Sequence, residues 1–150
     1  MIIGFLKEND ENETRSMLLP EHVRTISKIG FNVLVETNYS AKLNIKDTLY
    51  LDAGAEIKSA NDISLISDII VKISGKDLDK YSFKNGSLII MGFFDKSNEE
   101  ILKIKSDKNL EIFGLNYLPR ITRAQAMDVL SSQSNLAGYK AVIDTAYEFS

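Results

Sequence analysis

Short apolar runs alternate with helix-like stretches along the whole chain, and this alternation constrains the fold more than any other feature. Apolar, often β-branched runs at residues 2–6, 31–36, 69–73, 87–91 and 111–115 indicate strands, and the segments between them carry apolar residues at helical spacing. Such a pattern is typical of βαβ units around a mainly parallel sheet. The sequence therefore predicts an α/β fold, a flavodoxin-like three-layer sandwich with about five strands.

The signals for helices fall between these runs. Pro20 suits the first turn of a helix that reaches Gly30, a C-terminal stop. Shorter helices are expected near residues 50–53 and 61–66, and a longer one at 98–105.

The last helix is expected to begin near Ser132 and to pack on the sheet. Its apolar stripe consists of Leu136, Tyr139, Ile143 and Ala146. The helical pattern continues to Tyr147 and Phe149 without a glycine or proline before Ser150. We therefore expect residues 1–150 to be the N-terminal subdomain of a longer protein, with this helix leading onward.

Composition excludes several classes of protein. The 150 residues suffice for about one domain. With 18 Lys and Arg against 21 Asp and Glu the net charge is -3, which offers no basic field for nucleic acid. There are no cysteines, so disulfides and thiolate metal sites are excluded, and we expect no metal. The N-terminus lacks the pattern of a signal peptide, and no run approaches the roughly 20 apolar residues of a membrane span.

The stretch 118–133 is the densest in hydrogen-bonding side chains and is the main candidate for a ligand site. Arg120 and Asp128 can form an ion pair that stiffens the stretch. Gln125 and Ser131 offer donors and acceptors that suit an amide and ribose hydroxyls. The sequence therefore predicts a ligand-facing loop here.

A structural alternative stays open for the same stretch. Thr122 and Gln125 have the spacing of a capping box, which would start a helix at Arg123 and turn Gln125 back onto the backbone. As a loop, residues 120–128 are held by few apolar contacts and are expected to be more mobile than the last helix.

Charged residues also follow two of the expected strands, at the edge where open α/β sheets bind ligands. Lys7, Glu8, Glu13 and Arg15 follow the first strand, and Arg15 could clamp a carboxylate or phosphate. Lys72, at the end of the third strand, is placed to reach the same cleft. The alternative is a solvated charged loop and a lysine that snorkels at the sheet edge.

Two absences limit the chemistry. No two of the eight glycines are two residues apart, so the chain has no G-x-G-x-x-G pyrophosphate loop. The one histidine, His22, is expected on an exposed first turn of a helix. No residue is therefore assigned to acid/base catalysis.

The opening MIIGFLKENDENETRSMLLP and the segment LPRITRAQAMDVLSSQSNLAGYKAVIDTAY resemble the alanine dehydrogenase/transhydrogenase family. The similarity is greatest to the N-terminal part of the alpha subunit, the NAD(H)-binding component, of proton-translocating NAD(P) transhydrogenase. Ser16 and Met17 depart from the small apolar residues usual there, and Ala126 replaces a serine. The resemblance is weakest over residues 73–108, where SGKD replaces a proline of the family.

The resemblance implies roles for the residues of the polar stretch. Arg120, Gln125 and Asp128 would form a mobile loop that reaches the nicotinamide end of NAD(H), with Ser131 beside the carboxamide and Gln125 positioning the cofactor. The main anchor of NAD(H) would lie in a Rossmann domain that follows this chain.

The resemblance also implies an assembly. The complete enzyme would transfer hydride between NAD(H) and NADP(H) and couple this to proton translocation. Its partners would be an NADP(H)-binding domain and a membrane domain, and it would be a homodimer. This component would lie on the cytoplasmic face of the inner membrane, or in a matrix-like mitochondrial compartment in a eukaryote. The fragment alone is expected to be inactive.

Two other functions stay open. In the alanine dehydrogenase branch the residues that match Arg15 and Lys72 hold the carboxylate and carbonyl of the substrate, but its active-site histidine is missing from residues 91–94. The other alternative is a non-catalytic interaction module that docks on partners.

Overall fold

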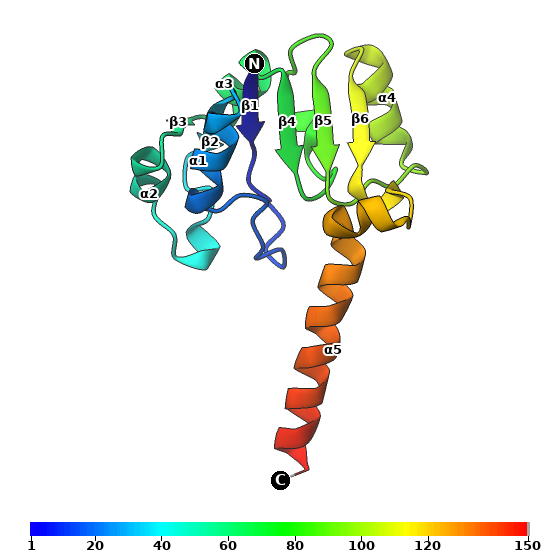
Figure 1. Ribbon diagram of the computed structural model, residues 1–150. Coiled ribbons are helices and arrows are strands. Elements are labelled where there is room, and N and C mark those ends of the chain that lie inside the picture. Colours follow the sequence, from blue (N-terminus) through cyan, green and yellow to red (C-terminus); the bar gives the residue numbers. More distant parts are fainter. Residues whose placement is uncertain (150) are drawn as a thin grey trace.

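The centre of the molecule is a six-stranded sheet in which every neighbouring pair is parallel, in the order β3-β2-β1-β4-β5-β6. A computed structural model describes residues 1–149 (Figure 1). The α/β class and the parallel sheet are as the sequence predicts, but the sequence does not predict the three-residue edge strand β3. The strands are β1 (Ile2–Phe5), β2 (Asn32–Glu36), β3 (Glu56–Lys58), β4 (Ile69–Lys72), β5 (Leu88–Met91) and β6 (Glu111–Gly114).

Helices begin at residues whose chemistry favours a helix start. Pro20 opens α1, and the side chains of Ser59 and Asn98 accept backbone N–H bonds at the starts of α3 and α4. The α-helices are α1 (Pro20–Lys28), α2 (Asp47–Asp52), α3 (Ala60–Ile66), α4 (Glu99–Asp107) and α5 (Val129–Glu148). Short 3-10 helices are η1 (Ala41–Leu43), η2 (Leu78–Lys80), η3 (Leu115–Tyr117) and η4 (Thr122–Met127).

The core has two halves, one on each face of the sheet. On one face, Val23 of α1 and Tyr50 of α2 pack against Phe5 and Val35. On the other, α3 and α4 pack through residues that include Ile63 and Ile101. The molecule therefore has the predicted three layers, and the connecting segments that follow the strands lie at the carboxyl ends of the sheet (Figure 1).

Helix α5 does not pack on the sheet but projects away from it (Figure 1). Leu136 and Tyr139 are 60% and 71% exposed, and Ile143 and Ala146 are also exposed. The predicted packing of this stripe on the sheet is therefore wrong, because helical spacing shows that a face is apolar and not what covers it. The expected start at Ser132 is also wrong, since Asp128 caps the helix and Val129 begins it.

The direction of the chain crossovers reverses between β1 and β4. The connection after β1 leads to β2 on one side, and the connection after β4 leads to β5 on the other. Open α/β sheets form a crevice at such a point, beyond the carboxyl ends of the strands. The loops that flank it here are residues 6–19 and 73–77.

Candidate functional site

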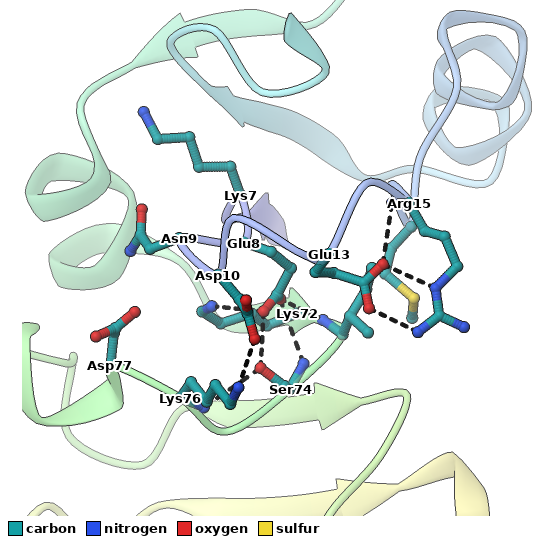
Figure 2. Close-up of polar contacts among 12 residues, drawn as sticks. Lys7, Glu8, Asn9, Asp10, Glu13, Arg15, Lys72, Ser74, Lys76 and Asp77 are labelled. Atoms are coloured by element: carbon teal, nitrogen blue, oxygen red, sulfur yellow. Dashed lines mark hydrogen bonds and ion pairs between the residues drawn. The ribbon is translucent and has the colours of Figure 1, made fainter. Parts of the chain in front are cut away.

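Glu8 lies in the crevice between the ends of β1 and β4. Its Oε1 accepts the backbone N–H of Ile73 at 2.8 Å and of Ser74 at 3.3 Å, and its Oε2 accepts the Ser74 hydroxyl at 2.7 Å. The Lys72 ammonium lies 3.1 Å from Oε2 (Figure 2), and the Lys72 and Glu8 side chains are 0% and 4% exposed. The loop after β1 is therefore fastened to the end of β4 by a buried charge pair.

Arg15 is held at the other end of the same loop. Its Nε and Nη2 donate to Glu13 at 2.8 and 2.6 Å, and its Nη1 donates to Oε1 of Gln133 in α5 at 3.0 Å. The hydrogen bond from Arg15 lowers the pKa of Glu13, and the same bond raises the pKa of Arg15. The predicted cleft position of Arg15 stays a prediction, but its guanidinium is engaged within the chain.

A network of hydroxyl groups supports this loop, and the sequence offers little sign of it. The Ser40 hydroxyl lies 2.8 Å from that of Ser16 and 2.6 Å from that of Tyr50, which donates to the carbonyl of Leu18 at 2.9 Å. The Tyr39 hydroxyl accepts the N–H of Met17 at 3.1 Å, and burial raises the Tyr39 pKa. The polar Ser16, at a position where the resemblance implies a small apolar residue, is the one signal that could have pointed to this network.

The four residues proposed for the cofactor lie together. Arg120, Gln125, Asp128 and Ser131 line one hollow of about 220 Å³, beside Pro119, Ile121 and Ala124. Neither Arg15 nor Lys72 lines it. Arg15 lines a neighbouring hollow of about 540 Å³, with Gly92, Phe93, Leu130 and Gln133 among its other walls, whereas Lys72 is fully buried.

The polar stretch contains a short 3-10 helix. Residues Thr122–Met127 form η4, whose N-cap is Ile121 without a side-chain cap bond. The predicted capping box at Thr122 is therefore wrong, because no α-helix starts after Thr122. The structure leaves Gln125 on the wall of the smaller hollow.

Asp128 acts as the N-cap of α5. Its Oδ1 accepts the N–H groups of Leu130 and Ser131, both at 3.0 Å, and its Oδ2 accepts the Ser131 hydroxyl at 2.6 Å. The Ser131 hydroxyl bond is the largest cause that lowers the Asp128 pKa, and the charge of Arg120 is the smallest. The described residues show no ion pair between Arg120 and Asp128. That predicted pair is therefore wrong, because the carboxylate is already committed to the helix end.

Among residues 1–149, the site contains neither a histidine nor a group of side chains that could hold a metal ion. Residues 91–94, beside the larger hollow, contain no histidine, and His22 is exposed on the first turn of α1 as predicted. Across residues 1–149 there is also no group of three or more His, Cys, Asp or Glu side chains that could hold a metal ion. None of the helices in this range is long and apolar enough to cross a membrane.

Comparison with known proteins places the chain in a family. The profile of the alanine dehydrogenase/PNT N-terminal domain matches residues 4–137. The chain belongs to this family. The family resemblance drawn from the two sequence segments is confirmed.

Several transhydrogenases are similar to this chain. The NAD(P) transhydrogenase subunit alpha of Haemophilus influenzae is 38% identical in an alignment of 150 positions, which covers 99% of this chain and 29% of that subunit. The crystal structure of transhydrogenase from Sinorhizobium meliloti superposes with a TM-score of 0.87 at 39% identity, over 99% of this chain and 45% of that one. An L-alanine dehydrogenase structure is more distant, with a TM-score of 0.69 at 25% identity over 77% of this chain and 32% of that one. The chain thus spans less than half the length of each of these relatives.

Proposed function

We propose that this chain is the first part of the NAD(H)-binding component of a proton-translocating NAD(P) transhydrogenase. The observation that carries the proposal is the hollow that unites Arg120, Gln125, Asp128 and Ser131. The names of the relatives in Haemophilus influenzae and Sinorhizobium meliloti support the same assignment.

The chemistry of the hollow fits one end of a nicotinamide dinucleotide. The Gln125 amide can donate and accept, and the Ser131 hydroxyl, whose hydrogen goes to Asp128, can still accept, so together they offer what recognition of a carboxamide requires. Its volume of about 220 Å³ is below the roughly 300–1,000 Å³ of sites that enclose a whole ligand. The rest of the cofactor therefore needs an anchor elsewhere, which we assign to a Rossmann domain that follows residue 150 in the complete protein.

The protein's part in the reaction is to position, not to react. When bound, the cofactor supplies the hydride chemistry. Gln125 orients the nicotinamide end, while Asp128 keeps the Ser131 hydroxyl and the start of α5 in place. Because Asp128, the acidic residue that lines the hollow, is engaged as the N-cap of α5, hydride transfer depends on the alignment of two nicotinamides.

The component works within a larger assembly. The partners are an NADP(H)-binding domain and a membrane domain, which together couple hydride transfer to proton translocation. The component forms a homodimer on the cytoplasmic face of the inner membrane, or on the matrix side in a mitochondrion.

Alanine dehydrogenase activity is the second candidate, favoured by the superposition with an L-alanine dehydrogenase. Two observations count against it. Residues 91–94 contain no histidine for proton transfer. In addition, the cations of Arg15 and Lys72 already pair with Glu13 and Glu8. A non-catalytic interaction module stays the third candidate.

A chimera tests these candidates directly. In it, residues 1–150 replace the matching segment of the Haemophilus influenzae alpha subunit, and the assembled enzyme is assayed for hydride transfer from NADH to NADP+. We expect transfer well above that of the enzyme lacking the segment. NADH oxidation with pyruvate and ammonium would instead support the dehydrogenase. A correctly assembled chimera without either activity would support the third candidate, the non-catalytic interaction module.

A further inference from the structure

The crevice between β1 and β4 contains a set of donors that converge on one point. The backbone N–H groups of Ile73 and Ser74, the Ser74 hydroxyl and the Lys72 ammonium all face the Glu8 carboxylate (Figure 2). Each of these groups directs a positive charge or a donated hydrogen at the Glu8 carboxylate. Such a set is the usual means by which proteins hold a small anion.

The space left between this carboxylate and Ile73 is small. The hollow that Glu8 shares with Ile73, with Arg15 and Ser16 among its other walls, measures about 10 Å³. That is roughly the room needed for a single water molecule. An external ligand therefore has no room between Glu8 and Ile73 while the Glu8 side chain is there. A larger hollow of about 300 Å³ that Glu8 also lines does not include residues 72–74.

The burial of Lys72 makes an anion necessary at this point. Its side chain is fully buried and its Nζ makes no hydrogen bond of good geometry, so its charge is balanced mainly by the ion contact with Glu8, with the charge of Asp77 also acting on it. Removing one partner of a buried pair leaves an uncompensated charge, which costs more than the pair itself contributes.

We propose that residues 72–74 form a carboxylate-binding cradle and that Glu8 is its internal ligand. Through this contact Glu8 is a positioning residue: it fastens the beginning of the loop that carries Arg15, whose guanidinium then reaches Gln133 in α5. The inference does not depend on the proposed function.

Chemical rescue tests the cradle. Glu8→Ala leaves a space that a small carboxylate can enter, so formate is the probe. We expect the substitution to lower the Tm of the chain by roughly 10 °C. Sodium formate should restore much of this loss in a saturable manner, whereas sodium chloride at equal ionic strength should not. If Glu8→Ala is unfolded at room temperature, the folded fraction is followed against formate concentration instead.

Two further variants make the result specific. Glu11→Ala removes an exposed carboxylate from the same loop, and its Tm should respond to formate no more than that of the wild type. Lys72→Met combined with Glu8→Ala removes the cation, and formate rescue should disappear. The proposal is overturned if formate fails to stabilise Glu8→Ala, or if chloride, the Glu11→Ala protein or the double variant shows the same effect.

Discussion

The Arg15 guanidinium donates to Oε1 of Gln133 at 3.0 Å and so joins the loop after β1 to the first turns of α5. Both residues line the larger hollow. Other residues that line this hollow adjoin, in the chain, the residues proposed to bind the nicotinamide. The buried Glu8 contact at the start of the loop and the Arg15 contact at its end therefore link the centre of the sheet to the base of α5.

Gln133→Ala should loosen this connection without unfolding the domain. The bond is exposed, so we expect the free energy of unfolding to fall by less than about 1 kcal/mol. Amide hydrogen exchange of residues 15–17 should become several-fold faster. Ser134→Ala, an exposed neighbour in α5, is the control and should leave exchange unchanged. Equal exchange in Gln133→Ala and wild type would show that the Arg15 contact does not hold the loop.

Gly4→Ala and Gly138→Ala should have opposite effects on stability. A Cβ at Gly4 would lie 2.3 Å from Cγ2 of Ile63 and 2.4 Å from Oγ of Ser67, so α3 would have to shift. We expect a loss of roughly 1–3 kcal/mol in the free energy of unfolding. At Gly138, in α5, a Cβ meets nothing within 4 Å, and helix propensity predicts a gain of up to about 1 kcal/mol. Urea unfolding of both variants tests the close approach of β1 and α3.

Asp128→Asn should change the pH dependence of α5. The Ser131 hydroxyl bond, with the backbone N–H bonds, holds the Asp128 pKa below its ordinary value of 3.8. The stability from the charged cap is therefore fully present above about pH 4 and is lost as the pH falls through the lower pKa of the folded state. Asparagine caps nearly as well but does not titrate.

Far-UV circular dichroism of the two proteins measures this effect. Other carboxylates titrate in the same range, so the difference between wild type and Asp128→Asn isolates the cap. We expect the wild type to lose more helical signal than the variant as the pH is lowered. Identical titrations would mean that Asp128 contributes no charge-dependent capping.

The isolated chain should bind NADH weakly or undetectably. The hollow that Gln125 lines has room for one end of the cofactor only, and the chain lacks a G-x-G-x-x-G loop for the pyrophosphate. Isothermal titration with NADH is the measurement. Micromolar affinity for this chain alone would mean that a complete site is present and that the proposed second anchor is unnecessary.

The sequence predicts the sheet better than it predicts the contacts of its helices. Strands such as β4 are continuous apolar runs because both of their faces are buried, and this leaves a clear pattern. β3 has three residues, Glu56–Lys58, and is too short and polar to produce one. The stripe of α5 has the same spacing whether it is buried or exposed, so its projection into solvent could not be inferred.

The candidate site was predictable in residue types but not in pairing. Lys72 at a strand end and Glu8 after another strand are visible in the sequence, but only the fold brings them to 3.1 Å. Asp128 was predicted to pair with Arg120, but its carboxylate caps α5 instead, because the N–H groups of Leu130 and Ser131 are close to it in the chain.

Hydride-transfer kinetics of Gln125→Asn in the Haemophilus influenzae chimera test the central claim most directly. Shortening the side chain by one methylene moves the amide but keeps its donors and acceptors, so alignment should suffer more than binding. We predict that the rate of hydride transfer from NADH to NADP+ falls at least tenfold while the Kd for NADH changes less than about twofold. An unchanged rate, or equal losses in rate and affinity, would contradict the positioning role of Gln125.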